Sequence, residues 1–252
     1  MSREAVVATG FLDRHVDFEG VRYPYQVYVP RDYDAARAWP VVLFLHGAGE
    51  RGSDGLLQTD VGIGAAIRRY PKRFPALVVM PQAPLETFWG GPPGDAALAA
   101  LDRTCAEFSV DRERTYLTGL SMGGHGSWLL GYREPTRFAA MLVICGFVGD
   151  RPNRPSVVPS GPGTPYERVA ARVKGVPIWI VHGEADAAVP VVESRRMHEA
   201  LRAVGPDVRY TELPGTNHDS WTAAYGSEAI VQWLFAQRRG AAPTTAKATK
   251  EG

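Results

Sequence analysis

Short apolar runs alternate with amphipathic stretches along most of the 252-residue chain. Continuous apolar runs are typical of strands buried on both faces of a parallel sheet, whereas helices place apolar residues every three to four positions. The runs that predict buried strands are residues 40–46, 76–80, 115–118, 138–145 and 177–182, with a more exposed strand at 208–213. The stretches that predict helices are residues 95–108, 122–132, 191–204 and 219–237. This alternation is typical of an α/β protein with a largely parallel sheet.

The first predicted strand, residues 21–29, has a different character. Its apolar and polar residues alternate only in part, and it contains Pro24. Because proline has no N–H to donate to a neighbouring strand, this pattern predicts an edge strand that runs antiparallel to its neighbour.

Glycine and proline are frequent, with 27 and 20 residues respectively. Many of them lie in the segments that follow the predicted strands, at residues 47–49, 81–84, 90–93, 119–124, 146 and 183. In open parallel sheets, ligands bind outside the carboxyl ends of the strands. We therefore expect the functional site at this edge of the sheet.

Composition narrows the possible partners. The formal net charge is +1, which argues against nucleic acid as a partner. Cys105 and Cys145 are too few for a disulfide framework and lack zinc-ligand spacing, so no metal site is expected. No apolar run approaches the roughly 18 residues of a membrane span, and the N-terminus lacks the apolar core of a signal peptide. These features predict a cytoplasmic protein with no membrane partner.

Residues 119–123 read Gly-Leu-Ser-Met-Gly, a G-x-S-x-G motif between a predicted strand and a predicted helix. In this context the turn from strand to helix is so tight that its flanking residues must be glycine. The backbone at Ser121 is then strained, and its hydroxyl projects above the sheet at a helix N-terminus that favours negative charge. Ser121 is therefore the candidate nucleophile; the alternative is a glycine-rich turn with a capping serine.

A serine nucleophile needs a histidine base and a carboxylate that orients the base, and in this context they follow in the order Ser, acid, His. His218 is the candidate base, because it lies in a loop between the last predicted strand and the last predicted helix. The other histidines are excluded by their order in the chain or by their placement on a helix or strand end: His15, His46, His125, His182 and His198.

Asp186 is the candidate acid. It lies in the loop after residues 177–182, and room for one helix and one strand remains before His218. Glu184 is the competing carboxylate, whereas Glu212 lies on a predicted strand and Asp219 lies directly beside His218.

An oxyanion hole requires two backbone N–H groups. Met122, the residue after the nucleophile, supplies one candidate, and Ala48, in the loop after residues 40–46, supplies the other. Residues 47–52 also match the dinucleotide-binding pattern G-x-G-x-x-G, but residues 53–55 prolong the loop where that pattern requires a helix. We therefore expect no nicotinamide or other cofactor.

Together these motifs resemble those of the α/β-hydrolases. The matching segments are residues 45–52 (Leu-His-Gly-Ala-Gly-Glu-Arg-Gly), Pro81-Gln82, residues 119–124, His182-Gly183 with Asp186 and Val189-Pro190, and Asn217-His218. The sequence is similar to carboxylesterases related to feruloyl and acetylxylan esterases, polyhydroxybutyrate-depolymerase-like proteins and dienelactone hydrolases, a group in which some members are named predicted peptidases. Dienelactone hydrolases carry cysteine as the nucleophile, so Ser121 does not fit that particular activity.

The resemblance covers roughly residues 20–237 and implies an α/β-hydrolase fold with a mostly parallel central sheet of about eight strands and helices on both faces. We expect one domain over residues 1–239, in which the proline- and glycine-rich residues 146–174 form a cap or lid. Residues 240–252 lack periodicity and predict a disordered tail.

With the resemblance, these residues predict a serine carboxylesterase that hydrolyses small or aryl, feruloyl-like, esters through an acyl-enzyme. The aromatic members of the candidate substrate pocket suit a flat apolar group. The candidate pocket residues are His46, Gly47, Trp89, Phe147 and Trp221. The alternatives are a thioesterase or lysophospholipase, a serine peptidase, and a non-catalytic binding protein of the same fold. The expected partner is a small-molecule ester, and the sequence leaves the oligomeric state open.

Overall fold

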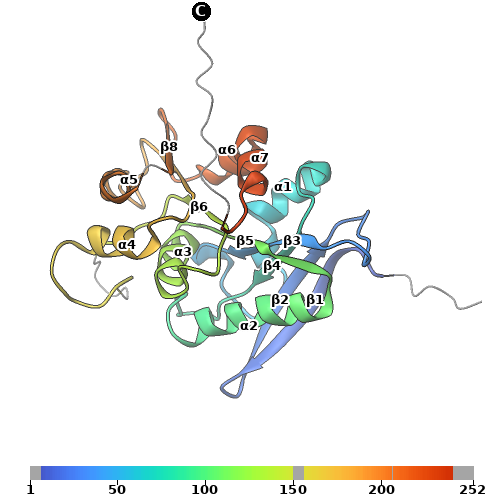
Figure 1. Cartoon of the computed structure of the whole chain (residues 1–252). Helices are drawn as coiled ribbons and strands as arrows, with labels where there is room; N and C mark the ends of the chain where they lie inside the picture. The colour runs from blue at the N-terminus through green and yellow to red at the C-terminus, as the bar shows by residue number, and fades with distance from the viewer. Residues whose placement is uncertain (1–6, 150–155, 206, 241–252) are drawn as a thin grey trace, which may run out of the picture.

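In the computed structural model, eight strands form one sheet in the order β1-β2-β4-β3-β5-β6-β7-β8 (Figure 1). The structure describes residues 7–149, 156–205 and 207–240. The strands are β1 (Gly10–Phe18), β2 (Val21–Val29), β3 (Trp39–Leu45), β4 (Leu77–Pro81), β5 (Val110–Leu120), β6 (Ala140–Ile144), β7 (Ile178–Gly183) and β8 (Val208–Leu213). β2 pairs antiparallel with both neighbours, and all the other pairs are parallel. The predicted mostly parallel sheet of about eight strands is confirmed.

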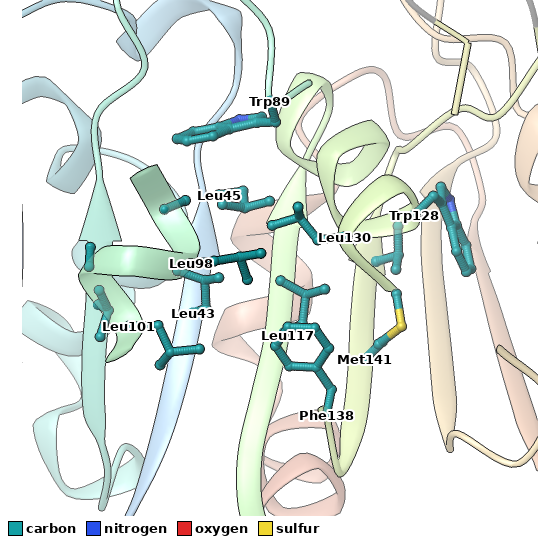
Figure 2. Close-up of a cluster of buried hydrophobic side chains, with 14 of the residues drawn as sticks. Leu43, Leu45, Trp89, Leu98, Leu101, Leu117, Trp128, Leu130, Phe138 and Met141 are labelled. Carbon is teal, nitrogen blue, oxygen red and sulfur yellow. The ribbon is translucent and has the colours of Figure 1, made fainter. Parts of the chain in front are cut away.

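Helices cover both faces of this sheet, and the pleat of each strand divides its side chains between two cores. Leu43 and Leu45 of β3 belong to one core, whereas Val42 and Phe44 belong to the other. The first core, part of which Figure 2 shows, is covered by α2 (Pro92–Glu107), α3 (Met122–Arg133), α4 (Pro165–Val173) and α5 (Val192–Val204). The second is covered by α1 (Ile63–Arg69), α6 (Trp221–Gly226) and α7 (Glu228–Ala236). Among the described residues, no helix has both the length and the apolar character that crossing a membrane requires.

The prediction that residues 21–29 form an edge strand was wrong, because β1 lies outside β2. β1 carries charged residues and is half exposed, so its sequence has no continuous apolar run. Pro24 fits in the inner strand β2 because it lies one residue beyond the last pair with β4, Tyr25–Pro81, and its carbonyl accepts a hydrogen bond from Gln82 N–H at 3.0 Å. The missing N–H therefore removes only the terminal bond of the ladder.

The helices differ from the prediction in two places. Residues 219–237 form two helices rather than one, and they meet at Ser227, whose side chain accepts a hydrogen bond from the backbone N–H of Ile230. α4 lies within the predicted cap, where Thr164 and Glu167 form reciprocal capping bonds and the apolar side of the helix joins the first core. Residues 156–163 contain neither helix nor strand, and a cap role for them stays a prediction. Residues 150–155 of that segment and 241–252 of the predicted tail lie outside the described residues.

Candidate active site

Ser121 occupies the turn between β5 and α3, where the chain passes very close to its neighbours. A Cβ atom at Gly119 would lie 2.3 Å from the carbonyl oxygen of Gly123, and one at Gly123 would lie 1.9 Å from the carbonyl oxygen of Leu45. Real side chains do not fit at such distances, so both flanking glycines of the motif are required by close approach.

The backbone of Ser121 is strained, as the motif predicts. Its φ is +53° and its ψ is −114°, a combination that L residues rarely adopt and that costs about 1–3 kcal/mol. Two backbone hydrogen bonds of 3.0 Å hold it there: Ser121 N–H donates to the carbonyl of Ile144, and the Ser121 carbonyl accepts from His125 N–H. The surrounding structure thus fixes the serine at the carboxyl edge of the sheet and at the N-terminus of α3.

A chain of hydrogen bonds joins Ser121, His218 and Asp186. His218 Nε2 lies 2.9 Å from Ser121 Oγ, and His218 Nδ1 lies 2.7 Å from Asp186 Oδ2. Since a carboxylate only accepts hydrogen bonds, Nδ1 carries the hydrogen and Nε2 accepts from the serine hydroxyl. The His218 side chain is 28% exposed while that of Asp186 is fully buried. Solvent and substrate can therefore reach the serine–histidine pair, but not the carboxylate behind it.

Close packing at the end of β7 positions the loop that carries His218. A Cβ atom at Gly183 would lie 2.2 Å from the carbonyl oxygen of Asn217 and 2.4 Å from that of Thr216. The residue before His218 is therefore pressed against the strand that leads to Asp186. This contact explains how residues far apart in sequence meet at one edge of the sheet.

The carboxylate of Asp186 accepts more hydrogen bonds than the one from His218. Its Oδ1 accepts from the backbone N–H groups of Ala188 at 2.9 Å and Val189 at 2.8 Å. Its Oδ2 also lies 3.2 Å from Nε2 of His182, whose side chain is completely buried. Sequence reasoning assigned no role to His182; its position four residues before Asp186, at a strand end, was the available signal.

Ala48 and Met122, the candidate oxyanion-hole residues, each begin a helical segment. Ala48 is the first residue of a short 3₁₀ turn, Ala48–Glu50, and Met122 is the first residue of α3. The N–H groups at such positions have no partner within their own helix. The residues that lead into these two segments touch, since a Cβ atom at Gly47 would lie 2.9 Å from Cδ1 of Leu120.

His46 supports this loop from beneath and is not exposed to a ligand. Its Nε2 accepts a hydrogen bond from Ala83 N–H at 3.0 Å, so Nδ1 carries the hydrogen and donates to the Gly47 carbonyl at 2.6 Å. Burial lowers the pKa of His46 to about 4, so the ring stays neutral near neutral pH. Its hydrogen bond orients the peptide group between Gly47 and Ala48, which carries the Ala48 N–H.

Three more of the predicted pocket residues have packing roles instead of facing a ligand. Gly47 is buried against Leu120. Trp89 is fully buried in the first core (Figure 2), where its indole N–H donates to the His46 carbonyl at 3.0 Å. Phe147 is 1% exposed and stacks on the ring of His125 at 4.4 Å between centroids. The loops that carry these residues fold inward, which the sequence pattern does not reveal.

Trp221 is the predicted pocket residue that remains partly exposed beside the site. Its ring meets the His218 ring edge to face at 5.3 Å between centroids. It also lines a cavity of about 330 Å³ between α1 and α6, whose wall includes Gly62, Ala65, Tyr70 and Tyr225. Gly62 lies against Leu120, the neighbour of Ser121, since a Cβ atom there would be 2.7 Å from Leu120 Cδ2. The cavity wall therefore contacts Leu120, the residue before Ser121, and contains Trp221, which contacts His218.

A larger cavity of about 820 Å³ lies between α4 and α5 and is lined by none of the predicted site residues. The Glu193 carboxylate at its wall accepts hydrogen bonds from the N–H groups of Val148 and Gly149 and from the hydroxyl of Tyr166. Glu193 thereby anchors the segment that follows β6.

One group of side chains within the described part of the chain has the donor types of a metal site. Its members are Cys145, Asp186 and His218, with ligand atoms within 4.8 Å of one another. Burial raises the pKa of the Cys145 thiol to about 12, so the thiol is protonated. Since Asp186 and His218 already bond to each other, the group lacks the free deprotonated ligands that a metal ion needs.

The fold and this hydrogen-bonded serine, histidine and aspartate define an α/β-hydrolase of the serine type. Residues 96–227, slightly more than half of the chain, match the family model described as phospholipase/carboxylesterase. The chain belongs to this carboxylesterase family of α/β-hydrolases.

Known proteins resemble the chain to different extents. A crystal structure of a thermostable esterase is 35% identical with a TM-score of 0.78, and the match covers 91% of this chain and 63% of that one. A ferulic acid esterase from Anaeromyces mucronatus, solved with ferulic acid, shares the fold at 21% identity and a TM-score of 0.66, covering 93% and 94% of the chains. An "Uncharacterized secreted protein" of Arthroderma benhamiae is 26% identical over 205 residues, 73% of this chain and 22% of its own length. The chain spans between 22% and 42% of the length of the curated relatives it matches.

Proposed function

We propose that the protein is a serine carboxylesterase that uses Ser121 as nucleophile, His218 as general base and acid, and Asp186 as the orienting carboxylate. The observation that carries this proposal is the continuous chain of hydrogen bonds from Ser121 Oγ through both nitrogens of His218 to Asp186 Oδ2. A strained serine at the start of a helix, facing solvent on one side and a base on the other, is suited to acyl transfer.

In the first half-reaction, Ser121 Oγ attacks the carbonyl carbon of the ester while its proton passes to His218 Nε2. The buried Asp186 stabilises the imidazolium that forms. The N–H groups of Ala48 and Met122 are proposed to stabilise the negative charge on the former carbonyl oxygen. When the tetrahedral intermediate collapses, the alcohol leaves with the proton from His218, and the acyl group stays on Ser121.

In the second half-reaction, a water molecule gives a proton to His218 and attacks the acyl-enzyme carbonyl. The second tetrahedral intermediate releases the carboxylic acid, and His218 returns the proton to Ser121. The ester is thus split by one water molecule, and the reaction consumes no cofactor.

For the substrate, we propose small or aryl esters, of which feruloyl esters are an example. The support comes from the cavity of about 330 Å³ beside Trp221, a volume at the small end of ligand pockets. Its aromatic walls, Trp221, Tyr70 and Tyr225, suit a flat group. The structural neighbour that contains ferulic acid shares the fold and is consistent with this choice.

The test is hydrolysis of p-nitrophenyl esters of increasing acyl length beside methyl ferulate, with the wild type and Ser121→Ala. We expect the substitution to lower kcat by about 10⁴-fold or more, because the nucleophile is lost. A folded Ser121→Ala protein with near wild-type turnover would refute the assignment. A strong preference for long acyl chains, about eight carbons or more, would contradict the aryl-ester proposal and favour a lysophospholipase or thioesterase, which need an extended apolar channel.

A further inference from the structure

We propose that His182 is a positioning residue for the reaction, acting through Asp186; this inference rests on the proposed function. His182 Nε2 lies 3.2 Å from Asp186 Oδ2, the same oxygen that His218 Nδ1 approaches at 2.7 Å. Two histidines thus share one carboxylate oxygen. Only His218 reaches Ser121, so His182 influences the serine through the carboxylate.

The surroundings of His182 determine which nitrogen carries its hydrogen. Nε2 faces two acceptors, the Asp186 carboxylate and the Val189 carbonyl at 2.9 Å, so Nε2 is the donor. Nδ1 lies 2.6 Å from the hydroxyl of Ser194 in α5, which donates to it. Burial lowers the pKa of His182, which keeps the ring neutral. The two acceptors at Nε2 therefore fix the tautomer that points an N–H at Asp186, and the Ser194 hydroxyl complements this tautomer at Nδ1.

The polar groups around His182 come from several elements. Asp186 and Val189 belong to the loop after β7, and Ser194 belongs to α5. Glu212 of β8 is the next carboxylate, and Arg195 and Tyr210 hold it by hydrogen bonds. Because Glu212 bonds to Arg195 and Tyr210, the groups next to the Nε2–H of His182 are the Val189 carbonyl and the Asp186 carboxylate.

This arrangement gives Asp186 three hydrogen-bond donors, two backbone N–H groups on Oδ1 and His218 on Oδ2, and places the His182 Nε2–H 3.2 Å from Oδ2 as a fourth polar contact. The donors fix the carboxylate plane and therefore the direction in which His218 points. The N–H of His182 also partly neutralises the negative charge on Oδ2, so Asp186 stabilises the imidazolium form of His218 less strongly. His182 thus affects both the geometry and the basicity of the proposed base.

The test replaces His182 by phenylalanine, which keeps a ring of similar size without the N–H. In His182→Phe we expect kcat/KM for a small ester to fall about tenfold to a hundredfold, because Asp186 loses one of its polar contacts. The acidic limb of the kcat/KM profile should move to higher pH by about half a unit to one unit, because the freed Oδ2 stabilises protonated His218 more strongly. A folded His182→Phe protein with an unchanged limb and unchanged kcat/KM would overturn the proposal.

Two further variants separate positioning from packing. His182→Gln can return an N–H near the former Nε2 position. The acidic limb of its kcat/KM profile should therefore lie close to that of the wild type. An acidic limb at the same pH as in His182→Phe would contradict the proposal. Ser194→Ala removes only the hydroxyl that donates to His182 Nδ1, so the ring is held less firmly and the acidic limb should move in the same direction by less. These two variants decide the question if His182→Phe does not fold. His198→Asn, a histidine of α5 that stacks on Tyr210, is the matched control and should leave the profile unchanged.

A readout without turnover keeps this inference separate from the proposed function. The proton on His218 Nδ1 should give a downfield ¹H NMR resonance that disappears in His218→Gln. In His182→Phe the resonance should move further downfield, because the bond to Asp186 strengthens. If no ester is hydrolysed but the resonance moves, the esterase proposal fails and the coupling of His182 to the pair stands. If esters are hydrolysed and the resonance stays in place, the coupling is absent.

Discussion

Gly123 of α3 lies directly against the carbonyl group of Leu45 at the end of β3, so close that a Cβ atom on it would be 1.9 Å from the Leu45 oxygen. The same Cβ atom would be 2.7 Å from the carbonyl oxygen of His46. This contact joins the turn that holds Ser121 to the loop that holds Ala48. The proposed nucleophile and the proposed oxyanion donor are therefore positioned by one close backbone contact between the start of α3 and the end of β3.

Gly123→Ala should destabilise the protein strongly. The new methyl group meets backbone atoms of β3, which cannot rotate away as a flexible side chain can, so we expect a loss of about 3 kcal/mol or more in the free energy of unfolding. Urea unfolding of the wild type and the variant measures this loss. Gly226→Ala is the matched control, because no atom lies within 4 Å of its added Cβ. We expect it to change stability by about 1 kcal/mol at most. Equal stability of the two variants would show that the contact is not close.

Ala48→Pro should remove the proposed oxyanion donor while keeping the loop in place. Ala48 is the first residue of its 3₁₀ turn, where proline fits, and Gly47 before it is extended, as a residue before proline prefers. We expect kcat for small esters to fall by about 10²- to 10³-fold with little change in stability. Gly49→Ala in the same turn, where an added Cβ meets nothing within 4 Å, should keep its activity. If the Ala48→Pro protein were fully active, the Ala48 N–H would not be the oxyanion donor.

Much of the sheet was predictable because its inner strands are buried on both faces. β3, β4, β6 and β7 have almost entirely buried residues, and the corresponding apolar runs were visible in the sequence. β1 was not predicted because it is an edge strand in which charged residues interrupt the apolar ones without a regular alternation. Burial on two faces leaves a continuous signal, whereas burial on one face leaves a weak one.

The proposed catalytic residues were predictable because their order and local motif restrict them, whereas the pocket was not. The G-x-S-x-G motif requires two glycines by close approach, and this signal does not depend on distant loops. Trp89 and Phe147 are aromatic residues in loops, and the sequence does not indicate that both fold into the interior. The position of His182 at a strand end, four residues before Asp186, was visible in the sequence, but its contact with that carboxylate follows only from the 3.2 Å distance in the structure.

Ala65→Trp should impair aryl esters selectively. Ala65 lines the cavity beside Trp221, and a tryptophan there would occupy space that we propose for the aryl group. We expect KM for methyl ferulate to rise about tenfold, with little change for ethyl acetate, which has no aromatic group to place in the cavity. Steady-state kinetics on both esters measure this difference. Lys72→Trp adds the same side chain at an exposed position that does not line this cavity, and it should affect neither ester. Parallel losses on both esters in Ala65→Trp would argue against the proposed subsite.

His46 should make the stability of the protein depend on pH in the mildly acidic range. Burial lowers its pKa from 6.5 to about 4, so between these values the unfolded chain binds a proton that the folded protein does not. The contribution of neutral His46 to the free energy of unfolding is therefore fully present above pH 6.5. As the pH falls from 6.5 toward 4, the free energy of unfolding decreases by about 3 kcal/mol because of this group. Urea unfolding of the wild type and His46→Gln at pH 7 and pH 4 isolates the effect, because the carboxylates titrate in both proteins. We expect the wild type to lose more stability than His46→Gln over this interval, by about that amount. Equal losses would mean that His46 accepts a proton in the folded protein, which its hydrogen bond from the Ala83 N–H opposes.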